Sequence, residues 1–325
     1  MNFIITGAAG FIGSHLTAKL LALHHRVIAI DNLSTGFLHN LDLVKDHPNL
    51  TVVVADVQQL TDWEQYAIQG DVIVHLAATV GVKKVCADAH DTLTNNLDST
   101  AAILDVAGRK KCKVFFASTS EVYGQSDKGH LSETDALSVY TTDQGRSSYV
   151  ISKLTNEISC LNSHQLKSVP VIIGRFFNVT GGNQKSEFGM VIPTFINNAM
   201  AGTAITLYND GSQRRSFCYI DDLLRAIVDL IAEPGAWGNI FNIGSDTSIT
   251  IKELAEYIRM KCNSASEIVN TPMPPERAAK SEVYSRLPSL EKIYEFIQWK
   301  PEVHWQDSVA MIIEKKEKDL RGEML

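Results

Sequence analysis

The fold class that this sequence predicts is α/β: a doubly wound parallel sheet of about seven strands with a smaller C-terminal α/β lobe. Two observations lead to this prediction. Short apolar runs alternate with helical patterns along most of the chain, which is typical of parallel strands joined by crossover helices. The stretch 2–31 opens the chain with one complete strand–turn–helix–strand unit.

This opening unit has the pattern of a dinucleotide-binding turn. The apolar run Phe3–Ile5 leads into a turn that holds Gly7, Gly10 and Gly13, and the second strand ends at Asp31. Such glycines allow a tight turn, close approach of the backbone to a pyrophosphate, and close contact between helix and strand. The pyrophosphate would lie at the helix N-terminus, where free N–H groups favour negative charge. A carboxylate at position 31 accepts hydrogen bonds from a ribose diol and repels a 2′-phosphate, so we expect NAD rather than NADP.

The later strands are expected to end beside the same cofactor. These strands are predicted at 51–55, 71–76, 113–117, 169–175 and 241–243. In open parallel sheets, ligands bind at the carboxyl ends of the strands. The residues that we expect to contact NAD come from these ends and from the glycine turn: Gly7, Gly10, Phe11, Ile12, Gly13, Asp31, Asn32, Ser34, Thr35, Gly36, Asp56, Val57, Leu76, Ala77, Ala78, Asn96, Ser118, Tyr149, Lys153 and Phe176.

Two chemically reactive side chains follow the fifth predicted strand. Tyr149 and Lys153 lie four positions apart in SSYVISK, which puts them on one face of a helix. A phenol near an ammonium group has its ionised form stabilised, so we expect the pKa of Tyr149 to fall and the residue to act as a base. Thr119 is placed to hydrogen-bond the same substrate hydroxyl. The alternative is an ordinary solvated helix face.

Composition narrows the class of protein. The chain has 325 residues, 45% of them hydrophobic, and a formal net charge of −7, so a nucleic-acid partner is not expected. No apolar run approaches the ~20 residues that span a membrane, and the N-terminus begins directly with a predicted strand. The cysteines are odd in number and without metal-type spacing, which favours reduced thiols in a cytoplasmic protein and predicts no metal site. They are Cys86, Cys112, Cys160, Cys218 and Cys262.

With these pieces in place, the chain resembles the extended short-chain dehydrogenase/reductases that modify nucleotide-sugars. The matching motifs are TGAAGFIG, HLAA, STSEVYG, SYVISK, RFFNVTG, RRSFCYIDDL and a late RLPS, in family order. The resemblance implies a Rossmann-type fold and tightly bound NAD. It also implies oxidation of the sugar at C4, with Tyr149 taking the hydroxyl proton and Lys153 lowering the pKa of the tyrosine. NADH usually returns the hydride, which leaves no net redox change.

The resemblance also implies the substrate contacts. Asn178 matches an asparagine that approaches the sugar diphosphate. Arg215 and Arg286 match arginines that grip phosphate, although surface ion pairs would explain them as well. The residues expected to bind the nucleotide-sugar, most simply a UDP-sugar, are Val80, Thr119, Ser120, Glu121, Asn178, Val191, Arg215 and Arg286.

Three reactions can follow C4 oxidation, and Ser120 and Glu121 bear on the choice. Our first expectation is an epimerase, because AATVGVKK resembles epimerase-like members and Tyr-Val-Ile-Ser-Lys stands where decarboxylases usually have Tyr-x-x-Gly-Lys. The alternatives are a UDP-glucuronate-type decarboxylase, which shares Thr-Ser-Glu and an arginine at position 286, and a 4,6-dehydratase that uses Glu121 as base. A 4,6-dehydratase often has an Asp where Ser120 stands. A non-catalytic NAD-binding sensor is a further alternative, although Thr119, Tyr149 and Lys153 are all present.

The expected organisation has two lobes that are not consecutive in sequence. The NAD-binding domain is expected over 1–178 with 213–244 returning to it, and the nucleotide-sugar lobe over 179–212 and 245–325. In the second lobe we expect a helix after Thr250, with Glu253 completing a capping box. A homodimer through a four-helix seam is implied by the resemblance. The candidate seam contacts are Ile103, Val106, Ile158 and Leu161, for which ordinary core packing is the alternative.

Overall fold

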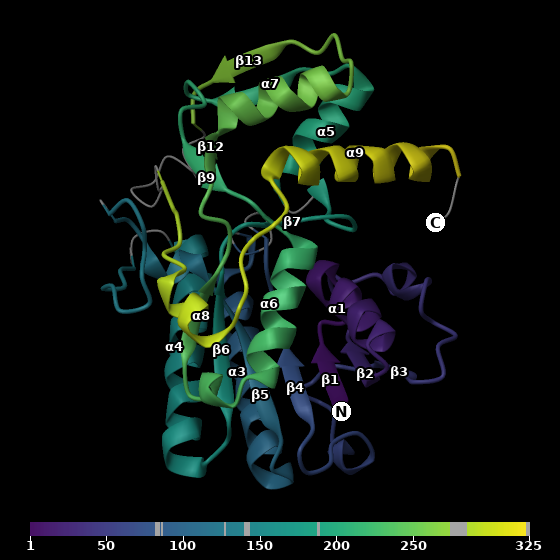
Figure 1. Cartoon of the computed structure of the whole chain (residues 1–325), viewed down its shortest axis with the longest axis vertical. Helices are drawn as coiled ribbons and strands as arrows, with labels where there is room; N and C mark the ends of the chain where they lie inside the picture. The colour runs from purple at the N-terminus through teal and green to yellow at the C-terminus, as the bar shows by residue number, and fades with distance from the viewer. Residues whose placement is uncertain are drawn as a thin grey trace.

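The computed structural model describes residues 1–81, 85, 87–126, 128–139, 144–186, 189–273 and 285–322. Within these residues, seven strands form one parallel sheet, as the sequence predicts (Figure 1). The strand order is β11-β6-β5-β4-β1-β2-β3. Its strands are β1 (Asn2–Thr6), β2 (Arg26–Asp31), β3 (Leu50–Val54), β4 (Val72–His75), β5 (Lys113–Thr119), β6 (Val171–Phe176) and β11 (Ile240–Ile243).

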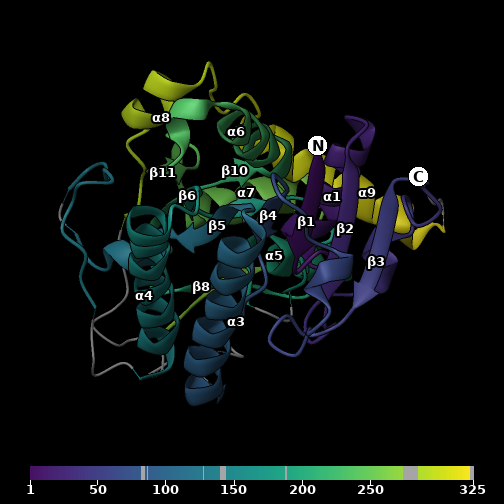
Figure 2. The same cartoon turned by 90° about the horizontal axis from the view of Figure 1, so that it is seen from below.

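Helices cover both faces of this sheet, which makes the fold doubly wound (Figure 2). On one face lie α1 (Phe11–Ala22) and α6 (Ile220–Ala232), and on the other lie α3 (Ala89–Lys110) and α4 (Gln144–Lys167). Short 3₁₀ turns are η1 (Leu38–Leu41), η2 (Trp63–Gln65), η3 (Ser120–Tyr123) and η5 (Pro234–Ala236). The neighbours β1 and β4 mark the point where the strand order reverses, and ligands bind in the crevice at such a point.

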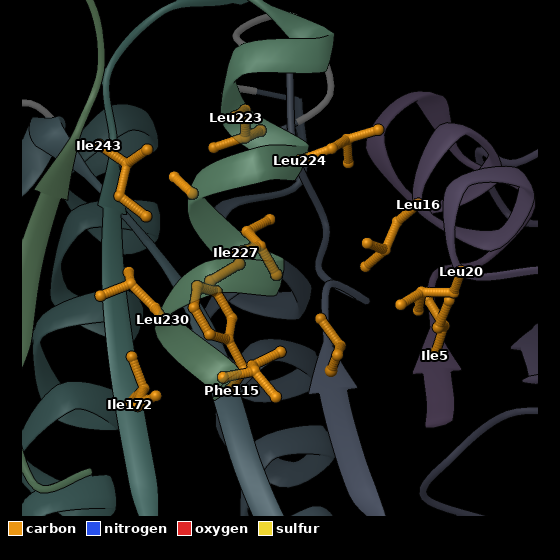
Figure 3. Packing of buried hydrophobic residues seen from close by; sticks show 14 of the residues in the cluster. Ile5, Leu16, Leu20, Phe115, Ile172, Leu223, Leu224, Ile227, Leu230 and Ile243 are labelled. Atoms are coloured by element: carbon orange, nitrogen blue, oxygen red, sulfur yellow. The ribbon is translucent and has the colours of Figure 1, made fainter. Parts of the chain in front are cut away.

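The core beneath α1 and α6 is a continuous apolar layer (Figure 3). Leu16 and Leu20 of α1 and Leu223 and Ile227 of α6 are fully buried. They pack on sheet residues such as Phe115. Side chains three or four positions apart lie on the same side of a helix, so these leucine and isoleucine side chains all face the sheet. This layer holds the N-terminus of α1 in place at the carboxyl edge of the sheet.

The second lobe is drawn at the top of Figure 1 and has its own apolar cluster. Its elements are α5 (Val191–Ala201), β8 (Ile205–Tyr208), β9 (Arg214–Ser216), β12 (Ser248–Thr250), α7 (Ile251–Lys261), β13 (Ile268–Thr271) and α9 (Trp305–Leu320). The short strands β7 (Val179–Thr180) and β10 (Cys218–Tyr219) pair with each other and pack with the core beneath α6. The short helix α8 (Glu291–Phe296) instead packs on β11 of the large sheet. Segment 213–244 divides: α6 and β11 join the large sheet, while β9 pairs with β12.

The capping box predicted at the start of α7 is present. The Glu253 backbone N–H donates to the Thr250 Oγ1 over 3.1 Å, and the Thr250 backbone N–H donates to the Glu253 Oε2 over 2.8 Å. Reciprocal bonds of this kind satisfy two N–H groups that a helix start otherwise leaves without a partner. Local sequence therefore sets this helix boundary.

The prediction of a dimer seam is wrong for two of its four residues. Ile103 and Val106 are 0% and 2% exposed, because they face inward from α3 into this chain's own core. Leu161 is partly buried against the same core, whereas Ile158 is 54% exposed on α4. The core alternative is therefore correct for α3, and the dimer itself stays a prediction. Cys86 lies outside the described residues, and no described helix is long and apolar enough to span a bilayer.

Candidate active site

One cavity of about 510 Å³ runs along the carboxyl ends of the strands, from the glycine turn to the second lobe. Every residue predicted to bind NAD lines this cavity except Gly36, which lies one position beyond the lining residue Thr35. Of the residues predicted to bind the nucleotide-sugar, Val80, Thr119, Ser120, Glu121, Asn178 and Arg286 line it. Val191 and Arg215 do not: Val191 begins α5 directly after the lining residue Met190, and Arg215 lies on β9.

The glycine turn is built for close approach. Gly7 has φ +71°, and a Cβ there would lie 2.8 Å from the backbone nitrogen of Ala77. A Cβ on Gly13 would lie 2.1 Å from the carbonyl oxygen of Gly7. Any larger residue would therefore push α1 away from β1 or distort the turn. The turn brings the first residues of α1, with their free N–H groups, to the wall of the cavity, where a pyrophosphate fits.

Asp31 is held at the end of β2 by two backbone donors. The N–H of Ala9 donates to its Oδ2 over 2.9 Å, and the N–H of Leu33 donates to its Oδ1 over 2.7 Å. Burial raises the pKa of Asp31, and these two hydrogen bonds oppose the rise. A carboxylate has about four acceptor positions. Asp31 lines the cavity, so its remaining acceptor positions suit a ribose diol and the residues here fit NAD.

Two asparagines beside the cavity join neighbouring segments of the chain by side-chain hydrogen bonds. The Asn32 Nδ2 donates to the Asp56 Oδ2 over 2.9 Å, which joins the ends of β2 and β3. Asn96 is 2% exposed: its Oδ1 accepts from the N–H of Thr79 over 2.7 Å, and its Nδ2 donates to the Ser152 Oγ over 3.1 Å. Asn96 therefore ties α3 to the loop after β4 and to the helix that carries Tyr149.

The catalytic candidates meet at the end of β5. Thr119 caps η3 by accepting the N–H of Glu121 over 3.2 Å, so Thr119, Ser120 and Glu121 are presented on one tight turn. The Lys153 Nζ donates to the carbonyl oxygen of Ala117 over 2.7 Å. Burial lowers the pKa of Lys153 to about 8, opposed by Cys160 and Glu157. These contacts fix the helix that carries Tyr149 and Lys153 against β5.

The expected fall in the pKa of Tyr149 is wrong for this structure. Burial raises the pKa of Tyr149, the Glu121 carboxylate raises it further, and a hydrogen bond with the Thr119 side chain opposes both. The ammonium of Lys153 is directed at a carbonyl instead of the phenol. Spacing along a helix indicated that the two side chains share a face, but it did not include burial or the carboxylate beside them. The phenol is thus held protonated.

The sugar side of the cavity is assembled from distant segments. The Asn178 Nδ2 donates to the carbonyl oxygen of Ser216 over 3.1 Å, which connects the end of β6 to β9. Arg286 is 8% exposed and comes from a segment paired with Leu131. The backbone N–H of Leu131 donates to Leu287 and that of Ser289 donates back to Leu131, over 2.8 and 2.7 Å. This pairing carries Arg286 into the cavity.

Several lining residues were not predicted from the sequence. The main ones are Phe37, Asn40, Gln58, Asp88, Asp91, Asn95, Asn183, Gln184, Lys185 and Met190. The run TGGNQK begins at Thr180, the last residue of β7, so its position beyond the carboxyl end of β6 was a usable signal. No comparable signal marks Phe37, over whose ring the Lys185 Nζ lies at 4.9 Å. In the described part of the chain, no group of His, Cys, Asp and Glu side chains is arranged as metal ligands.

Comparison with known proteins agrees with this geometry. The model of the NAD-dependent epimerase/dehydratase family matches residues 3–244. The chain is 35% identical over 316 residues to UDP-N-acetyl-alpha-D-glucosaminuronate decarboxylase of Bacillus cytotoxicus, with 96% of each chain covered. It is 31% identical over 323 residues to UDP-glucuronic acid decarboxylase 1 of Danio rerio, covering 98% of this chain and 73% of that one.

Two solved structures share the whole fold. The dTDP-glucose 4,6-dehydratase of Streptomyces venezuelae, with NAD bound, has a TM-score of 0.88 and 28% identity, with 98% of both chains covered. UDP-glucuronic acid 4-epimerase of Bacillus cereus, bound to NAD and a fluorinated UDP-sugar, has a TM-score of 0.87 and 26% identity, covering 98% of this chain and 99% of that one.

The fold and the cavity define an NAD-dependent enzyme of the short-chain dehydrogenase/reductase class. The chain belongs to the NAD-dependent epimerase/dehydratase family, whose members modify nucleotide-sugars. The sequence-based expectations of family, fold class and cofactor are thereby confirmed. The expectation of an epimerase is less well supported than its decarboxylase alternative, because the Bacillus cytotoxicus and Danio rerio relatives are both decarboxylases.

Proposed function

We propose that this protein is an NAD-dependent decarboxylase of UDP-hexuronates, with UDP-N-acetylglucosaminuronate or UDP-glucuronate as substrate. The observation that carries the proposal is the buried Arg286 in the same cavity as Thr119, Ser120 and Glu121. An ionised Glu121 by itself would repel a substrate carboxylate. A guanidinium in the same cavity offsets that repulsion and can bind a carboxylate or a diphosphate through paired N–H groups. Two curated relatives with decarboxylase activity support the same choice.

The proposed mechanism begins with removal of the C4 hydroxyl proton. NAD bound in this cavity would supply the hydride acceptor for C4 and the hydride donor for the return step. The Tyr149 phenol lies in the cavity, loses its own proton to water and then takes the hydroxyl proton, with Thr119 as hydrogen-bond partner. The Lys153 ammonium, fixed by Ala117, favours the ionised phenol when a substrate brings the groups together.

The C4 ketone then makes the sugar a β-keto acid. The C5–C6 bond breaks, carbon dioxide leaves, and the electron pair of that bond moves into the C4 carbonyl as an enolate. Water delivers to C5 the one proton that decarboxylation consumes, and return of the hydride to C4 would complete the reaction with no net redox change. In that return step Tyr149 gives the proton that it took from the C4 hydroxyl back to the C4 oxygen; burial and Glu121 raise its pKa, which favours the protonated phenol until then. Asn178 and Arg286 would hold the diphosphate and the carboxylate in place.

The test is product analysis by mass spectrometry with purified protein, NAD and a panel of nucleotide-sugars. The panel contains both UDP-hexuronates, UDP-glucose, UDP-N-acetylglucosamine and dTDP-glucose. Loss of carbon dioxide from a uronate, labelled at C6 to trace the leaving carbon, is the expected result. A new peak of unchanged mass would support an epimerase instead, and loss of water from dTDP-glucose would support a dehydratase. Either result without carbon dioxide release would contradict the proposal.

A matched variant sharpens the assay. Glu121→Gln keeps the size of the side chain and removes its charge. If Glu121 has an acid–base role, activity falls by about a hundredfold. If the charge of Glu121 merely repels the substrate carboxylate, the KM for the uronate falls in the variant. The inhibition constant of UDP-glucose, measured as a competitor of the uronate, then stays unchanged. Thr250→Ala, in the capping box of α7 and outside the cavity, is the control for a general loss of stability.

A further inference from the structure

A buried polar network lies beneath the turn that presents Glu121. Tyr123 ends η3, two positions after Glu121, and is 1% exposed. Its hydroxyl donates to the Asn242 Oδ1 over 2.7 Å and accepts from the Arg175 Nη1 over 3.0 Å. Tyr123 does not line the cavity. Any effect that it has on a bound sugar must therefore pass through its neighbours.

One branch of this network leads to Arg286. Asn242 lies on β11 and is fully buried. Its Nδ2 donates to the carbonyl oxygen of Leu131 over 2.8 Å. Leu131 in turn pairs with the segment around Arg286 through backbone bonds to Leu287 and Ser289, of 2.8 and 2.7 Å. A single side-chain amide thus joins the large sheet to the pairing that carries the arginine into the cavity.

The other branch leads to the catalytic helix. Arg175 donates to both carboxylate oxygens of Glu157, from Nε over 3.0 Å and from Nη2 over 2.8 Å. Glu157 lies on α4 one turn beyond Lys153, and the Ser118 Oγ donates to it over 2.5 Å. Arg175 and Glu157 are each 2% exposed. Tyr123 therefore joins the helix of Tyr149 and Lys153 to the segment of Arg286. Glu133 makes a second connection, because its carbonyl oxygen accepts from the Arg175 Nη1 over 3.3 Å and its Oε1 accepts from the backbone N–H of Asn242 over 2.7 Å.

We propose that Tyr123 is a positioning residue that sets the place of Arg286 relative to Glu121 by joining Arg175 to Asn242. The physical reason is the low polarity of the surroundings. Hydrogen bonds are stronger in a buried site, and a group left without its partner is costly, so the network has one favoured arrangement. Two contacts of the Asn242 amide link this network to the segment of Arg286: the bond to Leu131, and a second bond to the carbonyl oxygen of Ser289 over 3.4 Å. The Tyr123 hydroxyl donates to the oxygen of the same amide and so orients it. The catalytic consequence rests on the proposed function, whereas the structural link does not.

The structural link is tested by hydrogen exchange on the full chain. Tyr123→Phe removes one hydroxyl and keeps the ring, which packs on Phe177 with ring centroids 6.2 Å apart. We expect the backbone N–H groups of Leu131 and Ser289 to exchange about tenfold faster, since one net hydrogen bond is lost. Exchange in the α1 and α6 layer should be unchanged. Unchanged exchange at Leu131 and Ser289, or equal acceleration throughout the core, would overturn the proposal.

The matched control is Tyr257→Phe. The Tyr257 hydroxyl donates to the carbonyl oxygen of Gln306 over 3.2 Å and so joins α7 to α9, outside the cavity. The substitution Tyr257→Phe thus removes the same hydroxyl oxygen, but from a partly buried tyrosine. We expect it to leave exchange at Leu131 and Ser289 as in the unsubstituted protein. Acceleration there in Tyr257→Phe as well would show that the effect is not specific to the network.

The catalytic consequence is tested by a double-mutant cycle on uronate decarboxylation. Tyr123→Phe should lower kcat/KM about tenfold, chiefly through KM, in the unsubstituted background. In the Arg286→Ala background it should lower kcat/KM by less than about twofold, because the residue through which it acts is gone. Equal losses in both backgrounds would overturn the proposal. If the unsubstituted protein releases no carbon dioxide, the proposed function fails, and hydrogen exchange decides the role of Tyr123.

Discussion

The two ends of the cavity are built in different ways. The cofactor end comes from one contiguous stretch: Asp31 is held by the backbone of Ala9 and Leu33, and the glycine turn lies in the same unit. The sugar end joins segments far apart in sequence, as in the Tyr123–Asn242 hydrogen bond, whose partners are 119 positions apart. Short-range geometry therefore defines where NAD binds, whereas long-range contacts define what can be done to the sugar.

The charged side chains also differ between the two ends of the cavity. Asp31 and Asp56 line the cofactor end, whereas Arg286 and Glu121 line the sugar end. An acidic residue at the ribose selects the cofactor, and a guanidinium at the sugar end can bind a diphosphate or a carboxylate. If this division is correct, substitutions at one end should leave the other end working.

The largest effect is expected from Tyr149→Phe. The substitution removes the group that exchanges a proton with the C4 hydroxyl, so kcat should fall by about a hundredfold to ten-thousandfold. The ring and the helix contacts of Lys153 remain, so NAD content after purification should be unchanged. Turnover and cofactor content are measured on the same sample. A parallel loss of NAD would break the comparison, because the two ends would then not be separable.

Gly13→Ala is expected to have the next largest effect and to act at the cofactor end. Its new Cβ would lie 2.1 Å from the Gly7 carbonyl oxygen and 2.7 Å from the Ala8 Cα, so α1 must move away from β1. Overpacking of this kind costs about 1–3 kcal/mol. Calorimetric unfolding and NAD content should both show the loss. Gly129→Ala, where a Cβ meets no atom within 4 Å, is the control and should unfold as the unsubstituted protein does.

The same contrast explains what could be predicted from the sequence. The parallel strands, the glycine turn, Asp31 and the Thr250 capping box all follow from spacings within one or two elements. The direction of the pKa shift of Tyr149 could not be predicted, because it depends on burial and on Glu121. Ile103 and Val106 were assigned to a seam because an apolar helix face does not show whether it meets the sheet or a second subunit.

The hydrogen-bond network around Tyr123 could not be predicted from the sequence either. Tyr123 follows Glu121 in STSEVYG, and Arg175 opens RFFNV, so both belong to motifs that were noticed. Their partner Asn242 lies in a strand that looks like ordinary core in the sequence. A motif identifies which residues matter, but only the tertiary fold shows which of them touch.

Asp31→Asn should have a moderate effect confined to the cofactor end. The amide oxygen can replace one carboxylate oxygen, but the amide nitrogen cannot accept the N–H bond of Ala9 or Leu33. We expect NAD affinity to fall about tenfold and NADP affinity to rise relative to it, because the repulsion of a 2′-phosphate is removed. Titration calorimetry with both cofactors measures this change. Equal weakening of both cofactors would contradict the assigned role in selection.

The smallest effect is a pH dependence of stability at the junction of the two ends. Burial lowers the pKa of Lys153 to about 8 in the folded protein, against 10.5 for the ordinary side chain. Between these values the unfolded chain holds a proton that the folded chain lacks, so the contribution of Lys153 to the unfolding free energy rises with pH. The limiting slope is about 1.4 kcal/mol per pH unit.

Comparison with Lys153→Met isolates this contribution, because other titrating groups are common to both proteins. The charged or titratable groups around Lys153 are Glu157 and Cys160 on α4 and His75 on β4. His75 has a pKa of about 3 and burial raises the pKa of Cys160, so neither begins to titrate near pH 8. Denaturant unfolding from pH 7 to 10 should therefore show the unsubstituted protein gaining stability relative to the variant above about pH 8. A difference that stays constant with pH would mean that the ammonium is solvated in the folded protein, and that the wall between the cofactor and sugar ends is open to water.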